Sequence, residues 1–135
     1  MAVKTRLLAV SAVTALVGGR VWVMNWPQSP TLPGVLVQGW ELPTRTHLRG
    51  TDSLKSARIQ IDVLAETLAA AEAVDAAIVG DFSGGSATGL EGYAGAAGSI
   101  TIFSAFSVNA FPMRGEDELR KQRRVIREFR VTYED

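Results

Sequence analysis

The side chains best suited to chemistry are one histidine, His47, and carboxylates spread along the chain. No serine stands in a Gly-x-Ser-x-Gly elbow, so the sequence does not predict a Ser-His-Asp triad around His47. With only the distant Asp52 beside it, His47 also lacks the several ligands that a closed metal site requires. We therefore interpret His47 as a polar hairpin residue and expect no metal, no cofactor and no catalytic residue, which makes this chain a non-enzyme.

Carboxylates that are close in sequence could act as a general acid and base if a pocket raised the pKa of one of them. The pairs with this spacing are Asp62 with Glu66 and Glu72 with Asp75. Their placement on amphipathic elements favours solvent exposure instead.

Length and composition limit the class of protein. A chain of 135 residues is expected to form a single domain, residues 1–135. It contains no cysteine, which excludes disulfides and thiolate nucleophiles. Its 14 basic residues balance 14 acidic ones, so it has no basic excess for gripping nucleic acid or anionic lipid. Its partners are therefore expected to be protein surfaces, without a membrane.

Charge is distributed unevenly along the chain. Residues 59–113 contain no Lys or Arg and carry only the acidic residues Asp62, Glu66, Glu72, Asp75, Asp81 and Glu91. This stretch is either an ordinary solvated face or a surface that can lie beside DNA without holding it. The basic cluster around Arg120, Arg123 and Arg124 follows three acidic residues, which favours local ion pairing or a charged patch facing a partner.

The N-terminal pattern predicts a docked helix over residues 3–17. Val3, Leu7, Val10 and Val17 recur on one helical face, and two glycines follow. The alternative is a secretory signal, with Lys4 and Arg6 before an apolar run that is too short to span a bilayer.

Strict alternation of apolar and polar residues over 57–63 predicts a half-buried strand, which we extend over residues 55–65. It is expected to pair with a strand over 34–42 through a long hairpin whose tip covers 43–53, after a short strand at 20–24 and a proline-rich connection. Thr67 is the predicted N-cap of the following helix. That helix should bury the face formed by Leu68, Ala71, Val74 and Ile78.

Extended segments at 100–111 and 125–134, joined by a charged turn at 112–122, complete the predicted elements. The fold class is therefore α+β, with a mainly antiparallel sheet and a long hairpin packed by the N-terminal helix and the central helix.

Residues 80–99 contain seven glycines and are predicted to form a flexible loop. Gly92, Gly95 and Gly98 resemble a phosphate-binding loop, but no Gly-Lys-Ser/Thr ending follows. The large aromatic residues here, Phe82 and Tyr93, either anchor a neighbouring protein or pack against their own domain.

Several segments together resemble one family of structural proteins. They are Val17-Gly18-Gly19-Arg20-Val21, the proline-rich connection, Leu48-x-Gly50, the strand Ala57-Arg58-Ile59-Gln60-Ile61-Asp62-Val63, the alanine-rich helix, and the closing stretch from Arg124 to Tyr133. Over most of its length the chain is similar to the tail terminator, or tail completion, proteins of long-tailed bacteriophages and gene transfer agents. The glycine-rich loop over 80–99 is longer than that resemblance leads us to expect.

The resemblance implies a virion protein, made in the bacterial host cytoplasm and located at the tail-head junction. As a homo-hexameric ring it would cap the tail tube, end tail growth and bind the head connector or stopper protein, while DNA passes through its lumen without specific binding. We expect the interfaces with other copies or partners to include Trp26, Arg58, Asp62, Phe82, Tyr93, Arg120, Arg123 and Arg124. Two alternatives stay open, namely another neck component such as a head completion protein and a small α+β ligand-binding module.

Overall fold

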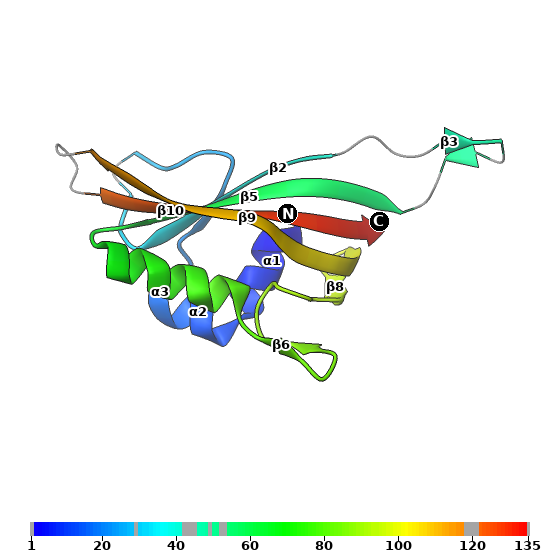
Figure 1. The fold of residues 1–135 in the computed structure, drawn as a ribbon, viewed down its shortest axis with the longest axis horizontal. Coiled ribbons are helices and arrows are strands. Elements are labelled where there is room, and N and C mark those ends of the chain that lie inside the picture. Colours follow the sequence, from blue (N-terminus) through cyan, green and yellow to red (C-terminus); the bar gives the residue numbers. More distant parts are fainter. Residues whose placement is uncertain are drawn as a thin grey trace.

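A computed structural model describes residues 2–28, 30–41, 46–48, 50–51, 54–117 and 122–134. The main element is a six-stranded sheet with the order β1-β2-β5-β10-β9-β8. Its strands are β1 (Val21–Val23), β2 (Gly34–Glu41), β5 (Lys55–Ala65), β8 (Gly95–Ala97), β9 (Ile100–Asp117) and β10 (Gln122–Glu134). The helices α1 (Ala2–Ala9), α2 (Ser11–Val17) and α3 (Leu68–Val79) all lie on one face of this sheet (Figure 1).

Two small hairpins project from this body (Figure 1). One pairs β3 (Thr46–His47) with β4 (Gly50–Thr51) beyond the end of the sheet, where the tip of the long hairpin was predicted. The other pairs β6 (Phe82–Ser83) with β7 (Ser86–Ala87) below the helices. His47 therefore lies in a hairpin strand, as predicted.

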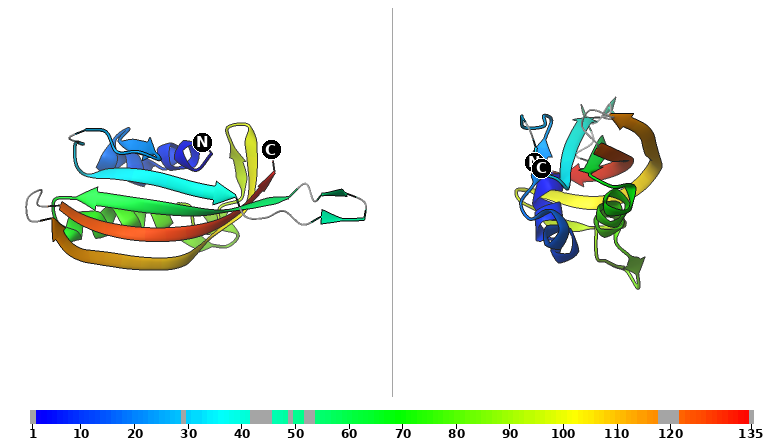
Figure 2. Two further views of the ribbon diagram at one scale, coloured as in Figure 1. Left: turned by 90° about the horizontal axis from the view of Figure 1, so that it is seen from above. Right: turned by 90° about the vertical axis from the view of Figure 1, so that its left-hand side faces the viewer.

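The predicted α+β class is confirmed. The long hairpin is antiparallel, with Val35 opposite Val63, and β10 pairs with β5 and β9 on its two sides. Only the short β1 runs parallel to its neighbour, β2, among the described pairs of strands. The sheet is strongly curled, so that β9 rises along one side of the molecule (Figure 2).

The N-terminal segment forms two helices, so the prediction of one continuous helix is wrong. Val10 interrupts it with an extended backbone (ψ 111°). The break allows α1 to pack against β1 and β8 while α2 packs against α3. The predicted apolar face is nevertheless buried, because Val3, Leu7 and Val10 are each at most 5% exposed. In the described part of the chain no helix has the length and apolar character needed to cross a membrane.

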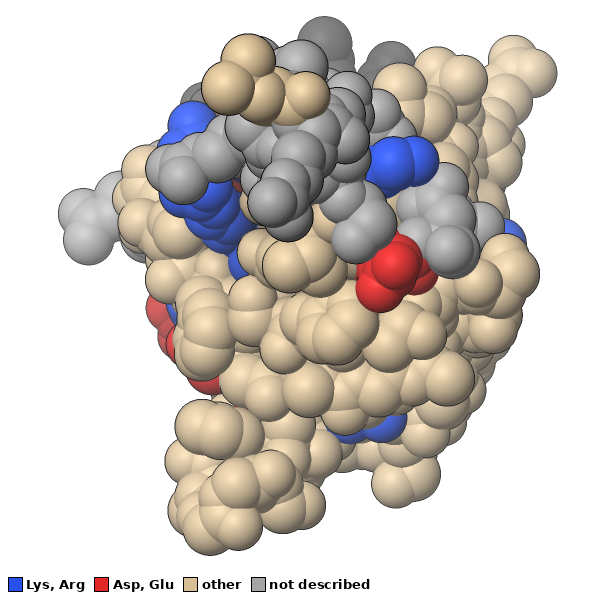
Figure 3. All heavy atoms as spheres, turned by 90° about the vertical axis from the view of Figure 1, so that its right-hand side faces the viewer, with Lys and Arg blue, Asp and Glu red and all other residues tan. Residues whose placement is uncertain are grey.

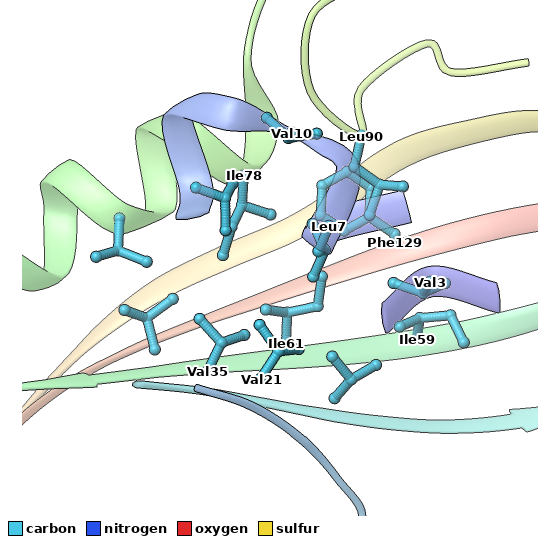
Figure 4. Packing of buried hydrophobic residues seen from close by; sticks show 14 of the residues in the cluster. Val3, Leu7, Val10, Val21, Val35, Ile59, Ile61, Ile78, Leu90 and Phe129 are labelled. Atoms are coloured by element: carbon cyan, nitrogen blue, oxygen red, sulfur yellow. The ribbon is translucent and has the colours of Figure 1, made fainter. Parts of the chain in front are cut away.

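The central helix agrees with the prediction at its start and along its buried face. The Thr67 hydroxyl accepts a hydrogen bond from the backbone N–H of Ala70 (3.1 Å), which caps α3. Ala71, Val74 and Ile78 are buried against the sheet. The core beneath the helices also includes Phe129, Leu7, Ile61 and Leu90, of which Leu90 comes from the glycine-rich segment (Figure 4).

The charged turn predicted over 112–122 is much shorter in the structure. The backbone of β9 continues to Asp117 and that of β10 begins at Gln122. An edge hairpin can keep its backbone pairing where its side chains are charged, because the ladder of hydrogen bonds does not depend on apolar alternation.

Candidate functional site

The glycine-rich segment contains a hairpin that presents an aromatic ring. Phe82 on β6 is 49% exposed, and its ring lies directly over Gly92. A Cβ atom on Gly92 would collide with this ring, and Gly92 also has a positive φ of 73°. Phe82 is therefore partly seated on its own chain and partly available to a partner.

Arg6 on α1 ties the same segment to the body of the protein. Its Nη2 donates hydrogen bonds to the carbonyl oxygens of Gly89 (2.9 Å) and Ala87 (3.3 Å). Its guanidinium carbon lies 3.8 Å from the centre of the Tyr93 ring, a cation–π contact. The Tyr93 hydroxyl in turn donates to the Ala96 carbonyl (2.7 Å). Tyr93 thus packs within its own chain, the second of the two alternatives for this residue.

The end of α3 receives the chain as it returns from the hairpin. The N–H of Leu90 donates to the carbonyl of Ile78 (2.8 Å). A Cβ on Gly89 would lie 2.5 Å from the carbonyl oxygens of Ile78 and Val79. Only glycine permits this approach of backbone to helix, so Gly89 lies where the segment joins the core.

The helix-free face of the sheet encloses a second, smaller buried cluster. Alternate residues of three neighbouring strands point into it, namely Leu36, Asp62, Leu64 and Ile126, all at most 7% exposed. The Gln60 Nε2 donates to the Asp62 carboxylate (2.8 Å). Arg124 Nη1 lies 4.0 Å from the other Asp62 oxygen. The prediction that Asp62 faces solvent is therefore wrong, because the curl of the sheet buries a face that a flat sheet would expose.

The second buried carboxylate, Asp75, forms a bidentate ion pair with Arg127. Its two oxygens accept hydrogen bonds from Nε and Nη2 of Arg127, both at 2.7 Å. Arg127 Nη1 also donates to the Ser107 hydroxyl (2.9 Å). The hydrogen bond to Asp75 raises the pKa of Arg127, with further support from the charges of Asp75 and Glu91 against the opposing effect of burial. The expected solvent exposure of Asp75 is wrong as well.

The remaining candidate interface residues are spread over the surface. Trp26 is half-buried, with its ring centre 5.3 Å from that of Trp22. Arg58 is exposed on β5 opposite Arg130. Arg123 is half-buried, and Arg120 lies outside the described residues. Of the predicted residues that the structure describes, Asp62 and Arg124 lie together, and these described residues do not converge on one site.

Sequence reasoning missed a group of exposed apolar residues on β9. Phe103, Phe106 and Val108 are each 47–49% exposed. The available signal was the absence of charge from residue 92 to residue 113, which the strand prediction did not use. The described residues contain no group of three His, Cys, Asp or Glu side chains able to hold a metal ion.

The fold and these surfaces define a small α+β protein whose exposed apolar and aromatic side chains suit contact with other proteins. The sequence model of the family described as "Tail completion protein gp17" matches residues 1–134. The chain therefore belongs to this tail completion family of virion structural proteins, which confirms the resemblance seen in the sequence.

The fold is also that of a solved virion chain. A chain from the structure "Virion of native gene transfer agent (GTA) particle" superposes with a TM-score of 0.64 at 21% sequence identity. The similarity covers 99% of this chain and 92% of that one. The comparison with curated proteins found no match.

Proposed function

We propose that this protein forms a hexameric ring that caps the tail tube, ends tail growth and joins the tail to the head connector. The observation that carries the proposal is the match to the tail completion family over residues 1–134. The similar fold of a chain in a gene transfer agent virion supports a place in the particle, and the tail-head junction is the position that we propose for it. The partners would be further copies of this chain, the tail tube protein and the connector or stopper protein.

The surface charge fits passage of DNA without a strong grip. Asp62 and Asp75 are buried beside arginines, so the outward-facing acidic side chains of the middle segment are chiefly Glu66, Glu72 and Asp81. Exposed carboxylates repel phosphates at short range, and a lumen lined by them would let DNA slide.

The ring can be tested with purified protein and polymerising tail tubes. We expect mass photometry and negative-stain images across a concentration series to show six-fold rings. Added to growing tubes, the protein should occupy one tube end and stop elongation. Binding to the portal rather than to the tube would instead favour a head completion protein, and tubes that grow to the same length with and without the protein would contradict capping.

Reversing the outward-facing acidic charges is expected to impair DNA delivery but not folding. In particles carrying Glu66→Lys and Glu72→Lys, delivery should fall by about tenfold, because the added cations would hold phosphates along the path. The loss should shrink as salt rises, since salt weakens such contacts. Particles with Glu66→Gln and Glu72→Gln are the matched control. Unchanged delivery at low salt in intact particles would argue against an acidic lumen.

A further inference from the structure

Residues 100–111 of β9 have the composition of a segment that pairs readily with other strands. They contain no charged residue, no proline and no glycine, but four β-branched residues and three phenylalanines. Short segments of this kind have a high β-propensity and add to other strands when their edge is open. The protein therefore needs some means of closing this edge.

Most of β9 lies at the edge of the sheet. Only its first residues, Ile100–Ile102, pair with β8, and beyond them β9 has only β10 as a neighbour among the described strands. The nearest charges on the helix-free face are Arg130, opposite Phe106, and Arg58, opposite Arg130. These arginines belong to the interior strands β10 and β5, so they lie beside the edge of β9 without covering it.

The glycine-rich segment occupies this edge at two neighbouring positions. The N–H of Gly92 donates a hydrogen bond to the Ala105 carbonyl (2.7 Å). The N–H of Ser107 donates to a carboxylate oxygen of Glu91, also at 2.7 Å. Both contacts use backbone groups of β9 that a further strand would otherwise pair with.

The parts of the edge on either side are protected without a charge. At the start of β9 the pairing comes from β8, and this end of the molecule faces the viewer in Figure 3, where few charged side chains occur in the lower half. Farther along, the N–H of Ala110 donates to the side-chain oxygen of Asn109 (2.9 Å). Among the described residues, Glu91 is thus the charged group that closes the middle of the edge.

Both partners of this contact are held in place. The N–H of Glu91 donates to the Val79 carbonyl at the end of α3 (3.1 Å), and the side chain of the preceding residue, Leu90, is fully buried. The Ser107 hydroxyl accepts a hydrogen bond from Nη1 of Arg127 (2.9 Å). Attraction between the charges of Glu91 and Arg127 is one cause of the raised pKa of Arg127. The carboxylate therefore meets the Ser107 N–H without freedom to turn away.

We propose that Glu91 is an autoinhibitory cap that prevents the β9 edge of one copy from pairing with residues 100–111 of a second copy. A second copy is the fitting occupant because it carries the same uncharged segment, and identical segments of this composition pair with one another. An incoming strand would have to displace the carboxylate from the Ser107 N–H and place its own carbonyl there. The displaced charge would then lose hydration without gaining a donor. This cap would act whether or not the proposed ring forms.

Removing the carboxylate is expected to open the edge. Thioflavin T fluorescence of purified Glu91→Ala should rise about tenfold faster than that of the wild type, because one charge-assisted hydrogen bond is lost. Glu91→Gln should lie nearer the wild type, since its amide oxygen still accepts from Ser107. Glu72→Ala, which removes a carboxylate from the exposed side of α3, is the matched control and should behave like the wild type. Circular dichroism checks that every variant is folded.

The double variant Glu91→Ala with Ser107→Pro distinguishes pairing at the edge from general loosening. Proline has no N–H to offer, and it is tolerated on an edge strand where the N–H faces away from the sheet. The double variant should therefore associate as slowly as the wild type, although it loses more contacts than Glu91→Ala does. Fast association of the double variant would overturn the proposal, as would equal rates for Glu91→Ala and Glu72→Ala.

Hydrogen exchange gives a second readout, which does not require the double variant to fold. In dilute Glu91→Ala the amides of residues 103–109 should exchange faster than in the wild type, and they should become protected again as the protein associates. Protection that appears only outside this stretch would overturn the proposal. Negative-stain images count six-fold rings separately, so a failure of the ring and a failure of the cap can be told apart.

Discussion

Replacing Asp75 by asparagine is expected to lower the free energy of unfolding by about 2–3 kcal/mol. The substitution keeps the shape of the side chain, removes its charge, and replaces one of the two oxygens that accept from Arg127 by an NH2 donor. The side chains of Arg127 and Asp75 are only 20% and 13% exposed, so water cannot fully replace the lost partner. Arg127 would remain as a half-buried cation between α3 and the sheet.

Urea denaturation followed by circular dichroism measures this loss. The control is Glu72→Gln, a matched change on the exposed side of the same helix, which should alter stability by less than about 0.5 kcal/mol. The double variant Asp75→Leu with Arg127→Met should recover most of the loss, because an apolar pair leaves no unpaired charge. A cost for Asp75→Asn as small as that for Glu72→Gln would show that the ion pair does not stabilise the fold.

The contribution of Arg127 should not vary near neutral pH. The hydrogen bond to Asp75 raises the pKa of Arg127 in the folded protein above its ordinary, already high value. A raised folded-state pKa contributes stability that is fully present below the unfolded-state pKa and is lost only as the pH rises through the folded-state value. Both values lie far above neutrality, so Arg127 is charged throughout the range from about pH 5 to 9.

The sequence predicted the parts of the fold that depend on local pattern. Alternation over residues 57–63 identified β5, and Thr67 marked the start of α3, because both signals lie within a few neighbouring residues. The ion pair was missed because Asp75 and Arg127 are 52 positions apart. Asp75 stands four residues after the buried Ala71 and therefore on the inner side of α3, but a charge there was interpreted as solvent-facing.

The candidate site was harder to predict than the fold, because the surroundings of Asp62 depend on the bending of the whole sheet and not on a local pattern. Asp62 occupies a polar position of an alternating strand, which in a flat sheet would face water. It is buried because the sheet curls. The bulges at Phe103 and Val108, which bend β9, cannot be recognised from the residues at those positions. Phe103 and Val108, the residues at these two bulges, are both exposed. Family membership could be inferred from the sequence because it rests on the order of elements, whereas contact surfaces depend on these irregularities.

Replacing Arg6 by methionine is expected to loosen the glycine-rich segment more than the rest of the protein. The change keeps much of the apolar stem but removes the hydrogen bonds to the Gly89 and Ala87 carbonyls and the cation–π contact with Tyr93. These contacts together should stabilise the local structure by about 1–2 kcal/mol. Amide hydrogen exchange in residues 86–93 should therefore become about tenfold faster, with β5 and β10 almost unchanged.

The comparison of Arg6→Lys with Lys4→Met separates geometry from charge. Lysine at position 6 retains the charge but not the forked guanidinium, so it should behave nearly as methionine does. Lys4→Met removes a charge from the same helix and should leave exchange in residues 86–93 as in the wild type. Equal exchange in all four proteins would mean that Gly89 and Leu90, packed on the end of α3, hold the segment without Arg6. Selective loosening would instead show that α1 holds a segment about 80 residues away in the sequence. Arg6 would do so through its contacts with the Ala87 and Gly89 carbonyls and with the Tyr93 ring.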